Sequence, residues 1–321
     1  MKFYFAPLEG VTGFTYRNAH QDFFGNDVDK YFTPFIVTNS KGKLSSKERK
    51  DIDPENNKNK FVVPQILTNN AEEFIKMSQT LKEFGYDEVN LNLGCPSGTV
   101  VSKKRGSGFL TETKELDEFL EQIFEADITK ISIKTRIGKE NPEEFYKLME
   151  IYNKYPMEEL IIHPRVQKDY YNNTPNMEIF KYAVETSKNK LCYNGDIFTD
   201  KQFKDFIEAF PSIDRIMLGR GLIANPGLIR DINEGITLEK KQLKEFHDRV
   251  YGDYKEVLYG DIPVLFKMKE LWFYMSQMFT NYEKYVKKIR KSQKLRDYDV
   301  AVEKLFEEQD ILPGTGLFSS K

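Results

Sequence analysis

The chain has 321 residues, of which 40% are hydrophobic and 31% are charged, and its net charge is −2. Such a composition is typical of a globular protein with one large domain and a smaller one, and the balanced charge does not by itself indicate nucleic-acid binding. No run of about 18 apolar residues is present and the N-terminus enters a strand directly, so we expect neither a membrane segment nor a secretory signal. Two distant cysteines and three histidines argue against a disulfide framework and against a metal centre, and they indicate a reducing, cytoplasmic location.

Short β-rich runs alternate with amphipathic helical segments through the first three quarters of the chain. The predicted strands are Lys2–Ala6, Tyr31–Val37, Phe61–Leu67, Glu88–Leu93, Lys130–Arg136, Glu159–His163, Lys190–Asn194 and Arg215–Gly219. The predicted helices between them are Ala71–Gly85, Thr113–Ala126, Pro142–Lys154, Met177–Thr186 and Thr199–Ala209. Eight strands alternating with helices favour an α/β fold of the closed (β/α)8 kind, a TIM barrel. No GxGxxG motif follows the first strand, which disfavours an open dinucleotide-binding sheet.

The alternation ends near residue 235, and the rest of the chain is helical in pattern. The predicted helices are Leu238–Tyr259, Pro263–Met278, Asn281–Lys294 and Asp299–Gln309. We therefore expect a barrel domain over residues 1–235, a small helical bundle over 236–312 and a flexible tail over 313–321.

The strand that ends near residue 93 carries the most informative polar side chains. Asn90 and Asn92 alternate with apolar residues, and Cys95 follows Gly94 in a Gly-rich polar loop. A free thiol has an ordinary pKa of roughly 8.5, so it holds a proton near neutrality that it can give up in a reaction. A single cysteine is more often a small buried hydrophobe. Its place at the end of a strand favours a chemical role instead.

Most of the other predicted strands also carry candidate site residues, many of them polar, at or just after the end where active sites form in a barrel. These residues are Pro7, Leu8 and Glu9, then Gln65, Lys134, Arg136, His163 and Arg165, and finally Asn194-Gly195-Asp196 and Gly219-Arg220-Gly221. Each alone has an ordinary structural explanation, but their convergence on one face predicts a site. The last two turns suit a phosphate, and a flat ring such as that of FMN would then extend over the barrel mouth toward Gln65, Lys134 and His163. Lys134 would stabilise the negative charge of the reduced ring.

Together, in this order, these motifs resemble those of the tRNA-dihydrouridine synthases over essentially the whole chain. The matching segments are Ala6–Arg17, Pro64-Gln65, Asn90–Pro96, Ser132–Arg136, His163–Arg165, Asn194–Ile197 and Gly219–Gly221. Two positions depart from the family pattern: Leu8 stands where Met is usual, a volume-conserving change, and Pro164 stands where Gly is usual, which restricts the loop that carries Arg165.

The resemblance implies an FMN-bound barrel with a C-terminal RNA-binding helical domain, which reduces the C5–C6 double bond of selected tRNA uridines with NADPH as reductant. Carried over by position, Pro7, Leu8 and Glu9 flank the flavin, and Gln65, Lys134 and His163 contact its ring. The residues that would hold its phosphate end are Asn194, Gly195, Asp196, Gly219 and Arg220. Hydride passes to uracil C6, and Cys95 protonates C5. We expect a monomer without a metal.

Several further residues are candidates for contact with the substrate. Asn90, Asn92 and Arg165 are expected near the uracil, which must leave its stack to reach the barrel mouth. Lys103, Lys104 and Arg105, before the flexible Gly106-Ser107-Gly108, suggest a basic lid. The run from 284 to 296 has no acidic residue and includes Lys287, Lys288, Arg290 and Lys291, with Tyr282, Tyr285 and Tyr298 beside it, which suggests an RNA-backbone surface.

Three other readings use the same residues. A flavin barrel that reduces a free pyrimidine, similar to dihydroorotate dehydrogenase, shares the Asn and Cys-Pro features but has no use for a basic helical domain. A lyase would use Lys134 as a Schiff-base nucleophile. A non-catalytic RNA-binding protein would have no need of Cys95, Lys134 and His163 together. The sequence leaves open which uridines are reduced and whether ribosomal RNA is also a target.

Overall fold

The computed structural model describes residues 1–312, so the predicted tail at 313–321 lies outside the described residues. The chain divides into two compact units, which we call the barrel unit (residues 1–7, 30–196 and 210–217) and the helical unit (8–29, 197–209 and 218 onward). This grouping rests on compactness alone, so the predicted functional division at residue 235 stays a prediction.

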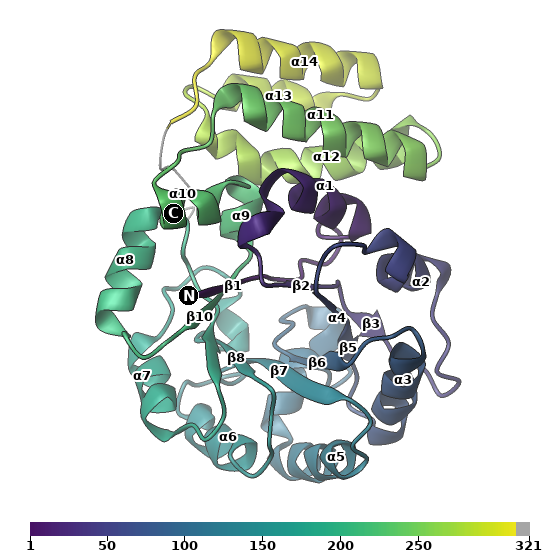
Figure 1. Cartoon of the computed structure of the whole chain (residues 1–321), viewed down its shortest axis with the longest axis vertical. Coiled ribbons are helices and arrows are strands. Elements are labelled where there is room, and N and C mark those ends of the chain that lie inside the picture. Colours follow the sequence, from purple (N-terminus) through teal and green to yellow (C-terminus); the bar gives the residue numbers. More distant parts are fainter. Residues whose placement is uncertain (313–321) are drawn as a thin grey trace. The chain divides into compact units, whose positions relative to one another are not determined.

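Ten β segments of the barrel unit form one parallel sheet (Figure 1). They are β1 (Lys2–Phe5), β2 (Lys30–Phe32), β3 (Ile36–Val37), β4 (Val62–Val63), β5 (Gln65–Leu67), β6 (Glu88–Leu93), β7 (Lys130–Arg136), β8 (Leu160–His163), β9 (Leu191–Tyr193) and β10 (Arg215–Leu218). Their order is β3-β5-β6-β7-β8-β9-β10-β1-β2-β4.

The sheet closes on itself. Only Pro64, which cannot donate a ladder hydrogen bond, separates β4 from β5, and β4 pairs with β2 while β5 pairs with β6. β2 and β3 are likewise halves of one strand. With each interrupted pair counted once, the described residues form eight strands whose order returns to its start, which confirms the predicted (β/α)8 barrel.

Helices follow the strands of the barrel unit. They are α2 (Ser46–Ile52), α3 (Ala71–Glu83), α4 (Gly98–Val101), α5 (Thr113–Glu125), α6 (Glu144–Tyr152) and α7 (Met177–Thr186). The longer helices α3, α5, α6 and α7 lie outside the strands (Figure 1). Local chemistry sets the starts of α2 and α3: Asn70 accepts a hydrogen bond from Glu73 N at the start of α3, and Ser45 and Glu48 form a capping box at α2. Helix α3 then buries Phe74, Met77 and Leu81 at helical spacing.

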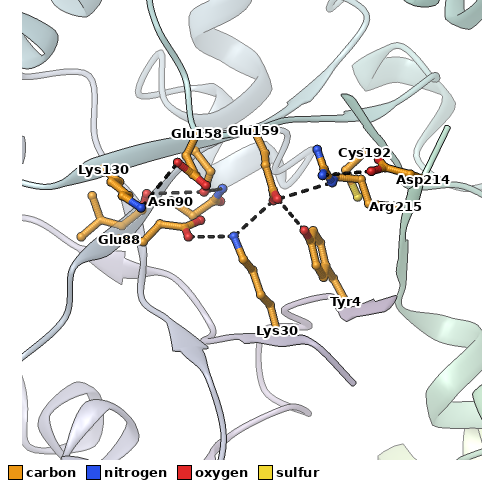
Figure 2. A network of polar contacts seen from close by, with 12 residues as sticks. Tyr4, Lys30, Glu88, Asn90, Lys130, Glu158, Glu159, Cys192, Asp214 and Arg215 are labelled. Carbon is orange, nitrogen blue, oxygen red and sulfur yellow. Dashed lines mark hydrogen bonds and ion pairs between the residues drawn. The ribbon is translucent and has the colours of Figure 1, made fainter. Parts of the chain in front are cut away.

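Charged side chains are buried at the amino-terminal ends of the strands, as Figure 2 shows. Glu159 accepts a hydrogen bond from Tyr4 Oη, and its carboxylate lies 3.4 Å from Lys30 Nζ and 3.6 Å from Arg215 Nε. Lys30 also pairs with Glu88 at 2.7 Å. Burial lowers the pKa of Lys30, but the attraction of Glu88 and Glu159 outweighs it, so that pKa is raised. This network lies opposite the strand ends that carry the predicted site, and sequence reasoning did not find it.

The helical unit contains α1 (Phe14–Phe24), α8 (Asp200–Ala209), α9 (Arg220–Ala224), α10 (Leu228–Glu234), α11 (Lys240–Val257), α12 (Asp261–Met275), α13 (Glu283–Lys291) and α14 (Leu295–Glu308). The last four confirm the predicted bundle (Figure 1). Within it the buried Tyr298 Oη accepts a hydrogen bond from Trp272 Nε1 at 2.8 Å and lies 2.7 Å from His247 Nε2. A second aromatic cluster joins Phe24 of α1 to Phe246 of α11, with ring centroids 5.4 Å apart.

Candidate active site

A chain of buried amides crosses three neighbouring strands of the barrel unit. Gln65 and Asn90 are paired in register, and Asn92 lies two residues further along the same face of β6. Asn90 Nδ2 donates to Ser132 Oγ (2.9 Å), Gln65 Nε2 donates to Asn90 Oδ1 (2.8 Å), and Asn92 Nδ2 donates to Gln65 Oε1 (2.7 Å). Since each amide nitrogen carries two hydrogens, Gln65 and Asn92 keep a further donor for a ligand. Asn90 is fully buried, and its contact with uracil stays a prediction.

The same amide chain fixes the backbone around Cys95. Asn92 Oδ1 accepts hydrogen bonds from the backbone N–H of Gly94 (3.0 Å) and of Cys95 (2.9 Å). The Cys95 carbonyl accepts from Ser107 N (3.1 Å) and from Ser107 Oγ (2.8 Å). Cys95 itself is half-buried, whereas Cys192 is fully buried and burial raises the pKa of its thiol well above the ordinary value. Cys95 is therefore the accessible thiol of the two.

The glycines after the basic loop are buried and closely packed, which corrects the prediction that this segment is flexible. Gly106, Ser107 and Gly108 are buried in a 3-10 turn that spans Gly106–Thr111. Gly106 has φ +55°, and a Cβ there would lie 2.8 Å from the Cys95 carbonyl oxygen. Only glycine allows this approach, so the segment supports the Cys95 loop.

The basic residues of this loop lie on the surface of the barrel unit. Lys103 and Lys104 are exposed, and Lys104 Nζ pairs with Glu112 at 3.0 Å. Arg105 is half-buried, with Nε 3.3 Å from Asn69 Oδ1. Their predicted role as an RNA-contacting lid stays a prediction.

Lys134 on β7 is half-buried, and within residues 1–312 its ammonium makes no hydrogen bond or ion pair. Burial, followed by repulsion from Arg136, lowers the pKa of Lys134 to about 8, and interactions with the thiols of Cys192 and Cys95 act in the opposite direction. Arg136 connects two loops, because its guanidinium donates hydrogen bonds to the carbonyls of Gly94 (3.1 Å), Val166 (2.8 Å) and Tyr170 (2.6 Å). The Cys95 loop is thereby tied to the loop after β8.

The lowered pKa of Lys134 predicts a pH-dependent stability in the flavin-free protein. Between pH 8 and 10.5 the unfolded chain still holds a proton that the folded chain has lost, so the free energy of unfolding rises with pH in this window. At about 1.4 kcal/mol per pKa unit the contribution reaches about 3 kcal/mol. Urea unfolding of wild type and of Lys134→Met at pH 7.5 and pH 10 checks this. We expect the free energy of unfolding of the wild type, relative to that of Lys134→Met, to be larger at pH 10 than at pH 7.5. A difference between the two proteins that does not change with pH would contradict a lowered pKa of Lys134.

His163 and Arg165 lie at the end of β8 and contact each other within the barrel unit. The Arg165 backbone N–H donates to the His163 carbonyl at 2.7 Å across Pro164, and Arg165 Nη1 lies 2.9 Å from His163 Nε2. Arg165 also forms an ion pair with Asp196. Asn194 Nδ2 donates to the Met217 carbonyl at 2.8 Å. Gly195 follows in the same half-buried turn, beside Asp196.

Four predicted site residues belong to the helical unit, whereas Pro7 ends the first segment of the barrel unit. Leu8 N donates to Thr12 Oγ1 at 2.8 Å, and Glu9 is exposed. Gly219 precedes α9, and the Arg220 guanidinium lies 5.4 Å from the centroid of the Phe198 ring. Their assignment to the flavin stays a prediction.

The basic run of the helical unit is exposed, but two of its predicted aromatic partners are not. Lys284, Lys287, Lys288, Arg290, Lys291, Lys294 and Arg296 are all exposed on or beside α13. Tyr285 and Tyr298 are 1% and 0% exposed, and their hydroxyls bond within the bundle, so they do not offer rings to RNA bases. At helical spacing they face the core, which corrects the expectation that they line the basic surface.

Comparison with known proteins decides the family. The sequence model of the dihydrouridine synthase family, Dus, matches residues 4–316. The chain belongs to the dihydrouridine synthase family. It is therefore a flavin-dependent oxidoreductase, and the resemblance identified from the sequence motifs is confirmed.

Named relatives agree with this family, and solved structures share the fold. The chain is 29% identical over 240 residues to a probable tRNA-dihydrouridine synthase of Staphylococcus epidermidis, covering 70% of this chain and 69% of that one. It is 28% identical over 279 residues to probable tRNA-dihydrouridine synthase 2 of Bacillus subtilis, covering 83% and 84%. Morphinone reductase (TM-score 0.51, 13% identity, 74% and 86% covered) and a Rhizobium histamine dehydrogenase (0.55, 13%, 79% and 48%) share the fold.

The described residues suit the polar edge of a flavin ring. The Lys134 ammonium and the second N–H of Gln65 and of Asn92 are donors, and the carbonyl oxygens and the ring nitrogens N1 and N5 of an oxidised isoalloxazine are acceptors. None of the helices within residues 1–312 is long and apolar enough to cross a membrane.

Proposed function

We propose that this dihydrouridine synthase reduces the C5–C6 double bond of specific uridines in tRNA, with FMN as its flavin and NADPH as the reductant. The relatives named above are probable tRNA-dihydrouridine synthases, which supports tRNA as the substrate. The observation that carries the proposal is a half-buried thiol, held by hydrogen bonds to its main chain at the end of β6, beside the strand that bears Lys134, a cation with no ion-pair partner in the described chain.

In this proposal the protein binds, orients and supplies a proton. Gln65, Lys134 and His163 hold the ring, and Asn92 holds the Cys95 backbone. FMN, when bound and reduced, would supply hydride to uracil C6. Cys95 Sγ holds the proton that C5 requires, and general acids of this kind contribute about 100- to 10,000-fold to a rate.

The direct test is incubation of the purified protein with FMN, NADPH and an unmodified tRNA transcript. We expect dihydrouridine, seen as a gain of two hydrogens at defined uridines by mass spectrometry, together with NADPH oxidation. Free uracil and a ribosomal RNA fragment serve as competing substrates. Reduction of free uracil alone, or a substrate adduct trapped by borohydride at Lys134, would contradict the proposal.

The exposed cations of α13 are expected to bind the RNA backbone. Replacement of Lys287, Arg290 and Lys291 by Glu should weaken tRNA binding at every sequence and reduce the dependence of log K on log salt concentration by about 2 to 3, because each lost phosphate contact removes about 0.7–0.9. Filter binding between low and moderate salt measures both quantities.

A matched control carries the same change in charge elsewhere. Lys114, Lys147 and Lys201 have side chains that are 85%, 63% and 82% exposed, each in an ion pair within its own helix. Their triple replacement by Glu should leave the salt dependence close to wild type. Equal losses in the two triple variants would show a general charge effect and exclude a specific surface on α13.

A further inference from the structure

Arg165 is a buried cation, and each nitrogen of its guanidinium has a hydrogen-bond partner. Its side chain is 1% exposed, and Nε donates to the Asn173 carbonyl at 2.5 Å. Nη1 donates to Asp196 Oδ1 at 3.0 Å, and Nη2 bonds the other carboxylate oxygen. Nη1 also lies 2.9 Å from His163 Nε2. The guanidinium is thus engaged by its own barrel unit and is not presented to RNA.

A guanidinium has donors and no acceptor, so the hydrogen bond between Arg165 and His163 has one possible direction. His163 Nε2 must accept, and a neutral imidazole that accepts at Nε2 carries its proton at Nδ1. We propose that Arg165, held by Asp196, is a positioning residue that locks His163 in the Nδ1–H tautomer.

The ring of His163 is also fixed in orientation. It stacks on Tyr171 with centroids 6.0 Å apart and planes at 27°, and the Arg136 guanidinium lies 5.4 Å from the centroid of the Tyr171 ring. With the ring plane and the tautomer both set, His163 donates a hydrogen from Nδ1 alone. That this donor faces the flavin rests on the proposed function, whereas the tautomer itself does not.

Asp196 acquires a different role from the one its position in the sequence indicates. A carboxylate repels a phosphate, so its negative charge does not suit a group that holds the phosphate end of FMN. Its bidentate pairing instead offsets the buried charge of Arg165 and orients the fork toward His163. Both residues then act through His163 and not on the substrate or on the phosphate.

Nitrogen NMR of the flavin-free protein labelled with 15N-histidine tests the tautomer directly. The chain has three histidines, and His163→Gln identifies the signals of His163 by their loss. We expect wild-type His163 to show a protonated Nδ1 and an unprotonated Nε2. Arg165→Met and Asp196→Asn should lose this signature and give averaged tautomers, together with weaker FMN binding. Asp200→Asn, which alters an ion pair on the surface of α8, should change neither.

The wild-type spectrum decides the inference even where a variant fails to fold. A protonated Nε2 in wild type would overturn it, and so would an unchanged tautomer in a folded Arg165→Met protein. The outcome separates from the proposed function, because the spectrum requires neither flavin nor RNA. Dihydrouridine formation with an Nε2–H tautomer would refute the positioning role and leave the function standing. An Nδ1–H tautomer in a protein that forms no dihydrouridine would support the locked tautomer and refute the proposed function.

Discussion

Cys95→Ala is expected to abolish dihydrouridine formation while FMN and tRNA still bind. In the proposed function the variant removes the thiol that supplies the proton to C5, and loss of a general acid lowers a rate by about 100- to 10,000-fold. The backbone of the loop should hold its place, since Asn92 and Ser107 bond the main chain of residue 95 and not its side chain. Single-turnover reduction of a tRNA transcript measures the rate, and flavin absorbance measures FMN content.

Cys192→Ala is the matched control for that experiment. Cys192 is the second cysteine of the chain and is fully buried in β9, so its loss should affect stability and not proton transfer. A rate for Cys95→Ala equal to that of wild type would remove Cys95 from the mechanism. A loss of FMN from Cys95→Ala would assign the residue to flavin binding instead.

Glu159→Ala is expected to destabilise the barrel unit by about 3–5 kcal/mol, because it removes the shared partner of a buried network and leaves charge behind. Glu159 is 3% exposed and interacts with Tyr4, Lys30 and Arg215 (Figure 2). Without it, the Arg215 guanidinium keeps only Asp214 as a carboxylate partner in the described chain. The midpoint of urea unfolding should fall accordingly.

The neighbouring carboxylate provides the control. The Glu158 side chain is 28% exposed and lies 3.9 Å from Lys130 Nζ, which is 66% exposed, so this pair is worth at most about 1 kcal/mol. Glu158→Ala should therefore leave the midpoint of urea unfolding almost unchanged. Equal shifts in the two variants would show that burial of Glu159 does not strengthen its interactions.

The strands and the main helices were predictable because apolar residues recur in their sequences at a regular period. The strands β6 and β7 have the bounds that alternation predicts, and α7 has those that helical spacing predicts. Helix α1 is not predicted by apolar spacing, because its buried face includes Arg17 and His20 beside apolar residues. The regular spacing of apolar residues identifies the buried face of a helix or strand. It does not identify polar residues that are buried together with their hydrogen-bond partners.

The same limit applies to the site. Residues at strand ends could be identified from the sequence, since parallel strands bring their carboxyl ends together. Ser107 and Ser132 could not, because their roles depend on hydrogen bonds to residues 12 and 42 positions away. The pairing of Arg165 with Asp196 likewise joins two loops, and nothing in either segment alone indicates the other. The two glycines that flank Ser107 are the sequence feature that could have indicated this closely packed segment.

The helical unit is assembled from three separate stretches of chain, and this constrains any transplant of it. A fragment that starts at residue 236 would carry Phe246 without the rings of Tyr16, Phe23 and Phe24, which contact it from α1 at centroid distances of 5.4–5.8 Å. The ring of Phe246 would then lose these contacts and face water. A chimera that exchanges the helical unit between relatives therefore needs residues 8–29 from the same parent as α11, so that the aromatic rings of α1 and α11 come from one sequence.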